Sequence, residues 1–380
     1  MNKNSPWFVT YAYGLTAVIL TVFVMIVGKS LLVPFLFAIF FSIMLSPLCD
    51  ALERIRIHRV LSVFISILLA LLVLSGIGFF LYTQLTDFTE DAAEFERRIS
   101  TLFEDLEGLL SILTGGNMIF SFEDLDESLL DFIRENAGEL TGRLADAASI
   151  LTAAFLVPVF VFLILLFRDF LKEFLLKAFG RQGDKSLRRI RRIVDQISSV
   201  VFYYIYGILI VISILALINS GFLLILGVEH AIFFGVFAAM MNVIPFVGPL
   251  LGSLLPALYA LLMMDSLLYP VIILAGFYII QLFEGNLFTP VIVGNKVKMN
   301  ALATLLLLFI GAQIWGLVGM ILFIPIGAIL KVIFDEFEET EPLGFLLGSV
   351  PAGMRTEKGP LARRIGRLSK KGAEGGADEE

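Results

Sequence analysis

Residues 231–264 read AIFFGVFAAMMNVIPFVGPLLGSLLPALYALLMM, a run of 34 residues without a charged side chain. A second charge-free run, 299–330, reads MNALATLLLLFIGAQIWGLVGMILFIPIGAIL. Each run is longer than the about 20 residues of one membrane crossing and too short for two full crossings. Prolines and glycines interrupt the first run at 242–249, and glycines interrupt the second at 311–319. Irregular backbone at membrane depth survives only where it is buried in protein or lines a watery cavity, so these breaks point to a transporter's binding site.

The composition of the whole chain also indicates a membrane protein. Hydrophobic residues make up 58% of the 380 residues and charged residues 17%, which leaves too little polar surface for a water-soluble fold. The charges gather in a few blocks and leave apolar stretches near or above the about 18 residues that indicate a span. There are eight such segments: 4–28, 30–49, 60–86, 147–167, 200–228, 231–264, 266–283 and 299–330. The sequence therefore predicts an all-α polytopic membrane protein.

The positions of basic residues predict the orientation, because cytoplasmic loops near spans carry an excess of Lys and Arg. Loop 50–59, region 168–199 and tail 336–380 each contain a cluster of basic residues. Residues 87–146 instead carry sixteen acidic and four basic side chains, a net charge of −12. This distribution places 87–146 outside the cytoplasm and both chain termini inside it.

These patterns divide the chain into six regions. The regions are transmembrane segments 1–3 (1–86), an acidic extracytoplasmic helical region (87–146), transmembrane segment 4 (147–167), a basic cytoplasmic amphipathic region (168–199), a C-terminal transmembrane transport region with the broken segments (200–335) and a disordered cytoplasmic tail (336–380). Apolar residues at helical spacing predict two amphipathic helices in the acidic region, which forms either a vestibule for cations or a solvated cap or oligomer contact. The basic region is expected to lie against anionic lipid headgroups.

Two topologies fit the long interrupted runs 231–264 and 299–330. If both runs cross fully, the chain has eight spans and Lys296 and Lys298 lie outside. If both are re-entrant hairpins, the chain has six spans and these lysines lie inside. The positive-inside rule favours the hairpins.

A polar cluster, 281–290, lies between the interrupted runs, and it supplies the remaining candidates for a solute or ion pathway. The candidate residues are Asn242, Pro245, Gly248, Pro249, Gln281, Glu284, Asn286, Pro290 and Gln313. The amides would supply donors and acceptors for a polar solute, and the Pro and Gly positions would expose backbone groups. Glu284 would be the coupling group, since an ionisable residue beside a membrane segment is a functional hypothesis by default. The alternatives are interhelical hydrogen bonds for the amides, and for Glu284 a solvated carboxylate or an ion pair with Lys296 or Lys298.

Three stretches carry a resemblance to a known family. They are NVIPFVGPLLG at 242–252, FEGNLFTPVIVGNKVKMNALATLLLL at 283–308 and GAQIWGLVGMILFIPIGAILKVIFD at 311–335. In this order they resemble the C-terminal half of the autoinducer-2 exporter family of membrane permeases, and the similarity extends over about residues 8–335. The resemblance implies export of a furanone signalling molecule or sodium/proton antiport, and a homo-oligomer, a pentamer, with one pathway in each subunit. The sequence departs from the family near Asn300 and Ala301, where many members have a His-Pro pair.

The sequence thus predicts a secondary transporter that moves a small polar solute or signalling molecule across the bacterial inner membrane. The alternatives are a sodium(lithium)/proton antiporter and an oligomeric channel. An enzyme is not expected, because the sequence contains no HExxH motif, nucleophile elbow or metal cluster, and no Walker A motif indicates a pump. The expected partners are membrane lipids, a small solute or a monovalent cation or proton, and further copies of the chain. No cofactor, metal or nucleic acid is expected.

Overall fold

The structure is a computed structural model that describes residues 7–90, Arg97, 147–179, 184–264, 266–292 and 299–349. The regular elements of these residues are helices, which confirms the all-α prediction. They are α1 (Trp7–Val27), α2 (Lys29–Arg54), α3 (Arg59–Glu90), α6 (Ala147–Leu166), α7 (Arg168–Phe179), α8 (Asp184–Ile225), α9 (Ala231–Met241), α10 (Val247–Met263), α11 (Leu268–Phe283), the π-helical turn η2 (Glu284–Phe288), α12 (Thr289–Ile292), α13 (Ala301–Trp315), α14 (Leu317–Glu336) and α15 (Glu341–Leu347). The two helices predicted in 87–146, and Lys296 and Lys298, lie outside the described residues.

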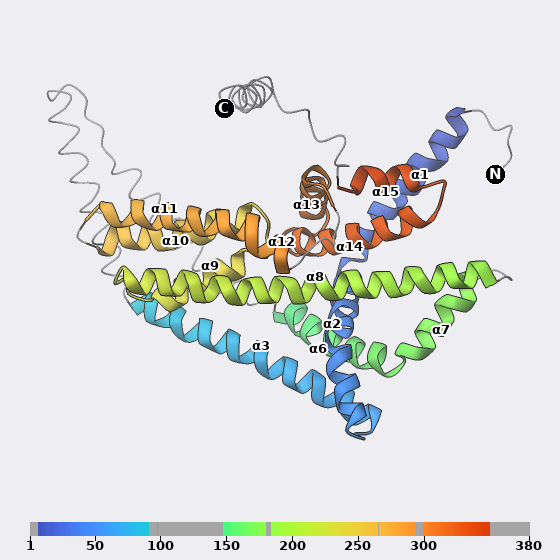
Figure 1. Cartoon of the computed structure of the whole chain (residues 1–380), viewed down its shortest axis with the longest axis horizontal. Helices are drawn as coiled ribbons and strands as arrows, with labels where there is room; N and C mark the ends of the chain where they lie inside the picture. The colour runs from blue at the N-terminus through green and yellow to red at the C-terminus, as the bar shows by residue number, and fades with distance from the viewer. Residues whose placement is uncertain are drawn as a thin grey trace, which may run out of the picture.

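Helix α8 is the longest helix of the described chain, and the other helices are arranged around it (Figure 1). Its 42 residues correspond to about 63 Å, roughly twice the about 30 Å hydrocarbon thickness of a membrane. Figure 1 shows α10, α11 and α12 on one side of α8 and α3, α6 and α7 on the other. The sequence boundary at 199 therefore marks a change from basic to apolar composition within one continuous helix.

The basic N-terminal part of α8 contacts the C-terminal end of α14. Arg189 and Arg192 lie 3.7 and 3.8 Å from the Glu336 carboxylate. The Arg189 guanidinium also lies over the Phe337 ring, 4.6 Å from its centroid, a favourable cation–π distance. The two arginines thus hold the end of α14 against α8.

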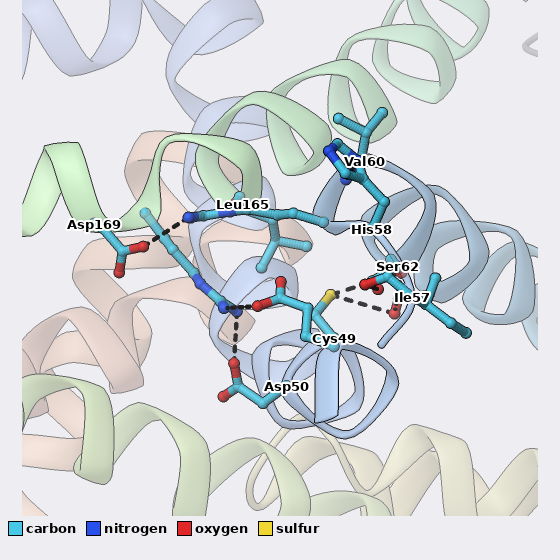
Figure 2. A network of polar contacts seen from close by, with 12 residues as sticks. Cys49, Asp50, Ile57, His58, Val60, Ser62, Leu165 and Asp169 are labelled. Carbon is cyan, nitrogen blue, oxygen red and sulfur yellow. Dashed lines mark hydrogen bonds and ion pairs between the residues drawn. The ribbon is translucent and has the colours of Figure 1, made fainter. Parts of the chain in front are cut away.

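Helices α2, α3 and α6 pack into a bundle whose polar end is shown in Figure 2. The buried Cys49 thiol donates a hydrogen bond to Ser66 Oγ at 3.2 Å. At the bend between α6 and α7, Arg168 pairs with Asp50 and Glu53, both at 2.8 Å. A 71° bend separates Ala154–Leu166 from Arg168–Phe179. The carboxylates of α2 therefore hold the residue at which the chain turns from α6 into α7.

The two interrupted runs each form a pair of helices that fold back on each other. A Cβ added to Gly252 would lie 2.8 Å from Ala238 Cα, so α9 and α10 are packed at backbone distance. In the second pair, a Cβ on Gly311 would lie 2.4 Å from the Gly319 carbonyl oxygen, and α13 meets α14 as closely. Small residues at these positions allow the backbones to approach, as at many membrane helix interfaces. The breaks predicted at 242–249 and 311–319 are confirmed.

The described part of the chain contains five helices long and apolar enough to cross a membrane, or six with the bent α6–α7 pair as one span. These are Lys29–Arg54, Arg59–Gln84, Ser186–Ile225, Leu268–Ile292 and Leu317–Glu336, with Ala154–Leu166 in the bent pair. The molecule is therefore a multi-pass membrane protein. The predicted number of eight segments and the location of the termini stay predictions.

The predicted disordered tail is wrong for its first residues, because α15 forms over Glu341–Leu347. Asn300 fixes this helix to the start of α13. Its side-chain amide donates hydrogen bonds to the Leu346 and Gly348 carbonyl oxygens at 2.6 and 2.8 Å. Its side-chain oxygen accepts a bond of 2.7 Å from the Ala303 amide and thereby caps α13. The ordered structure therefore continues past residue 336.

Candidate functional site

The polar cluster 281–290 lies where α11 passes into the π-helical turn η2 and then α12. A π-turn places residues five apart above one another, and such turns are frequent at functional sites. Thr289 accordingly stands over Glu284, and its backbone amide donates to the Glu284 carbonyl oxygen. The Glu284 carboxylate accepts two side-chain hydrogen bonds, one from Gln281 Nε2 at 2.8 Å and a short one from Thr289 Oγ1. Two neutral donors therefore hold the carboxylate in place.

This carboxylate lines a cavity of about 580 Å³ between α8 and the two helical pairs. Asn242, Pro245 and Pro249 line it from the α9–α10 break, and Thr304 and Ile324 from α13 and α14. Glu284 is the one charged side chain among the residues that line it. The remaining lining residues are Tyr204, Ile208, Val211, Ile212, Val243, Phe246, Gln281, Gly285 and Thr289. The fold thus brings both interrupted runs to a single carboxylate.

A second cavity of about 290 Å³ adjoins the first. Asn242, Pro249 and Gln281 line both cavities, so these three residues form the wall between them. The second cavity is otherwise lined by residues of α8 to α11: Leu215, Asn219, Ala238, Leu250, Ser253, Leu274, Phe277, Tyr278 and Ile280. No charged side chain occurs among these lining residues.

The break between α9 and α10 has a strained backbone at the cavity. Phe246 has φ +67°, a conformation that bulky side chains rarely adopt and that costs about 1–3 kcal/mol. The next turn is tightly packed, because a Cβ on Gly248 would lie 1.8 Å from the Met241 carbonyl oxygen. Only glycine fits this position without displacing the backbone. The sequence 242–249 therefore turns the chain sharply at the point where Asn242 reaches both cavities.

The structure brings together five of the nine residues proposed from the sequence. Asn242, Pro245, Pro249, Gln281 and Glu284 line the larger cavity, and Gly248 is buried behind them in the turn.

The other three residues point elsewhere. Asn286 is exposed, and its amide donates to the Leu282 carbonyl oxygen of its own helix at 2.8 Å. Pro290 and Gln313 are also exposed, and neither lines a cavity described above.

Sequence reasoning missed several polar residues of the two cavities. Thr289 and Thr304 line the larger cavity, and Asn219 and Ser253 line the smaller one. Asn219 had a usable signal, since an amide followed by Ser220 interrupts a long apolar run. The threonines had no comparable signal, because threonine is common in apolar helices.

The chain matches the family model of the AI-2E family transporter over residues 15–339. It belongs to the AI-2E transporter family. The matched residues include α2 to α14 and both cavities, so the site described above is part of the AI-2E transporter fold. This membership agrees with the resemblance seen in the sequence, and it makes the chain a membrane transport permease and not an enzyme.

Curated relatives are similar to this AI-2E family member over most of their length. The putative transport protein YrrI of Bacillus subtilis (strain 168) is 29% identical over 331 residues, which cover 82% of this chain and 88% of YrrI. The AI-2 transport protein TqsA of Escherichia coli (strain K12) is 26% identical, covering 85% of this chain and 91% of TqsA. A sodium-lithium/proton antiporter of Halobacillus andaensis is 26% identical, covering 81% of this chain and 89% of that protein.

The site of this AI-2E family transporter offers polar contacts without a metal centre. Within the described residues, no group of three or more His, Cys, Asp or Glu side chains could hold a metal ion. The cavities instead provide side-chain amides, hydroxyls and one carboxylate. The backbone amides expected to be exposed at the α9–α10 break are bonded within the turn, those of Asn242, Val243 and Gly248 included. This arrangement can bind a small polar solute by hydrogen bonds, and its carboxylate can bind a proton or a monovalent cation.

Proposed function

We propose that this protein is a secondary transporter of the bacterial inner membrane that exports a small polar solute through the cavity around Glu284. The observation that carries the proposal is the convergence of both interrupted helix pairs on one carboxylate. Transporters commonly place substrate and coupling ion at such discontinuous helices. The cavity volume of about 580 Å³ falls within the range of small-molecule sites.

A signalling molecule such as autoinducer-2 is the proposed solute. The relative TqsA is named an AI-2 transport protein. The cavity suits such a molecule, since amides and hydroxyls among apolar walls recognise a compact polar solute. The Glu284 carboxylate is available to link its movement to a proton or cation gradient.

Sodium(lithium)/proton antiport is the second candidate function. It is favoured by the single carboxylate in the cavity, because a carboxylate can exchange a proton for a monovalent cation. The Halobacillus relative is named a sodium-lithium/proton antiporter. Glu284 would then bind the two ions alternately, and the bonds from Gln281 and Thr289 would hold its charged form. An oligomeric channel is a third and weaker candidate.

We further infer that the α9–α10 and α13–α14 pairs are re-entrant hairpins with both chain termini in the cytoplasm. Support comes from α9, whose 11 residues extend only about 17 Å and cannot cross the about 30 Å hydrocarbon layer. The basic region 168–199 would contact anionic lipid, and the family resemblance favours a homo-oligomer, a pentamer.

Labelling of a cysteine substituted for Lys298 tests the hairpins: labelling from inside supports them, and labelling from outside supports eight spans. A cysteine in 87–146 should label from outside and one in 168–199 only after permeabilisation.

Flux into proteoliposomes tests the transport proposal. The purified full-length protein is reconstituted, and uptake of autoinducer-2 and of Li⁺ is measured with and without an imposed proton gradient. We expect gradient-driven accumulation of autoinducer-2 above its external concentration. Accumulation of Li⁺ alone would favour the antiporter, and downhill flux without accumulation would favour a channel. Absence of flux for both probes would refute the proposal.

A further inference from the structure

The side chain of Asn219 has a property that none of the proposed pathway residues shares. It lies on α8 with 4% of its surface exposed, and its buried side-chain oxygen has no hydrogen-bond partner within the described structure. Buried carbonyl oxygens in proteins are nearly always bonded, since desolvation without a partner is unfavourable. An exception beside a cavity indicates a group that takes its partner from the cavity, either a water molecule or a bound ligand.

Buried hydroxyls elsewhere in the described helices do have hydrogen-bond partners. Ser42 Oγ donates to the Ala38 carbonyl oxygen at 2.6 Å, and Ser66 Oγ to the Ser62 carbonyl oxygen at 2.8 Å. Even Ser220, next to Asn219, reaches the Ile232 carbonyl oxygen at 3.4 Å. The helix backbone satisfies these donors. The Asn219 oxygen is an acceptor, so it needs a donor from elsewhere.

The surroundings of Asn219 hold it in this position. A Cβ added to Gly235 of α9 would lie 2.2 Å from Ser220 Oγ, so α8 and α9 meet at the closest distance that glycine allows. This fit leaves α8 little freedom to rotate and carry Asn219 to a new partner. The Asn219 side chain therefore stays at the edge of the smaller cavity, which it lines.

The smaller cavity has the chemistry of a site for an uncharged solute. Its polar lining consists of three amides, Asn219, Asn242 and Gln281, and two hydroxyls, Ser253 and Tyr278. No carboxylate or cationic side chain lines it, so neither a bare cation nor an anion would find a compensating charge. A hydroxyl group can donate to the Asn219 oxygen and accept from an amide at the same time. Asn242, Pro249 and Gln281 line both cavities, so the smaller cavity lies next to the Glu284 cavity.

We propose that Asn219 binds a hydroxyl group of the transported solute in the smaller cavity, as a stage on the pathway distinct from the Glu284 cavity. This inference rests on the proposed transport of a small polar solute. In this proposal the two cavities have different roles. The smaller cavity recognises the uncharged solute, and the Glu284 cavity couples transport to an ion. Asn219 is thus a specificity residue for the solute and has no role for the ion.

The test compares purified Asn219→Leu with wild type and with Ser213→Ala as the matched control. Ser213 lies on the same helix, is exposed, and bonds only the Leu209 carbonyl oxygen of that helix. Autoinducer-2 and Li⁺ serve as probes in proteoliposome flux, and Tm is measured in detergent. We expect Asn219→Leu to raise the KM for autoinducer-2 roughly tenfold, equivalent to about 1.4 kcal/mol. If Li⁺ is transported, the KM of Asn219→Leu for Li⁺ should equal the wild-type value. Ser213→Ala should have the wild-type KM for both probes.

The Tm separates this role from a structural one. Leucine removes a buried oxygen without a partner, so the variant should melt at or above the wild-type Tm while its autoinducer-2 transport is weaker. If Asn219→Leu has the wild-type KM for autoinducer-2, the inference is overturned. It is also overturned if this variant raises the KM for Li⁺ and not the KM for autoinducer-2.

Asn219→Ser is the second variant and keeps an acceptor at the site. Its KM should fall between wild type and Asn219→Leu, and a KM equal to or above that of Asn219→Leu overturns the inference. If Asn219→Leu fails to assemble, the Asn219→Ser KM decides alone, and a wild-type value then overturns the inference. Wild-type protein that moves neither probe refutes the proposed function itself, a result distinct from failure of the Asn219 variants in an active transporter.

Discussion

Replacing Glu284 by glutamine removes the one charge that lines the larger cavity and keeps the side-chain volume nearly constant. The carboxylate accepts bonds from Gln281 Nε2 and Thr289 Oγ1. A hydrogen bond to a charged group contributes about 1.5–3 kcal/mol and a neutral one about 1 kcal/mol. Both bonds can persist in Glu284→Gln, since the glutamine oxygen accepts from Gln281 and its amide donates to Thr289. The two weakened bonds together lose about 2 kcal/mol, so the variant should assemble with a lower Tm.

The functional effect of this change should exceed its effect on stability. Glutamine resembles the protonated acid permanently, so we expect gradient-driven flux to fall at least roughly tenfold, or about 1.4 kcal/mol. The residual flux should no longer rise with an imposed proton gradient. The assay is proteoliposome flux from about pH 5.5 to about pH 8.5, with oligomer size measured in parallel.

A matched control separates the carboxylate from its neighbours in the sequence. Asn286→Ala alters an exposed side chain two residues away that bonds its own helix, and it should leave flux and pH dependence unchanged. An assembled Glu284→Gln protein with wild-type flux at every pH would refute the coupling role of Glu284.

Three further predictions concern packing, ion pairing and burial. Gly248→Ala should destabilise the protein by about 1–3 kcal/mol, because the new Cβ would lie 1.8 Å from a backbone oxygen. The control Gly285→Ala places its Cβ in open space and should keep the wild-type Tm. Equal Tm values for the two variants would contradict the packing. Arg168→Leu should lower the free energy of unfolding by about 2 kcal/mol, since it leaves the Asp50 and Glu53 carboxylates without their cation. The control Lys177→Ala breaks only an exposed ion pair and should have the wild-type Tm. Cys49 is fully buried, so a maleimide should label it only after denaturation, and rapid labelling of the native protein would show that the α2–α3–α6 bundle opens.

Local sequence signals were sufficient to predict the breaks in the two long apolar runs. Proline lacks a backbone donor and glycine allows positive φ, so the cluster 242–249 and Gly316 could be expected to end helices. Gly316 does so at φ +66°. The first break lies at the cavity of Gln281 and Glu284, as its polar and proline residues suggested. The second helix pair instead reaches this cavity through Thr304 and Ile324, away from its break at Gly316, and no local signal indicated that. Composition could not predict that α8 continues across residue 199, since a change from basic to apolar side chains leaves a helical backbone unchanged.

Helix geometry explains why some residues grouped by the sequence do not share a cavity. Asn286 was grouped with Glu284 because the two are close in sequence, yet residues two apart on a helix point in nearly opposite directions. The π-turn then places Thr289, five residues on, above Glu284, where ordinary α-helical spacing would place residue 288. The ordered α15 was missed because its docking depends on Asn300, 46 residues earlier than Leu346, a pairing that no local pattern reveals.

The unbroken length of α8 makes it a rigid link between its basic N-terminal end and the smaller cavity. A rod of about 63 Å that tilts by about 10° around its midpoint moves its two ends by about 5 Å in opposite directions. Because α9 packs against α8 at Gly235, α9 would tilt with it. One end carries the arginines that grip Glu336, and the other end carries Asn219. Release of the Arg189 and Arg192 contacts with Glu336 would remove one restraint on such a tilt, and the tilt would change the position of Asn219 beside the smaller cavity.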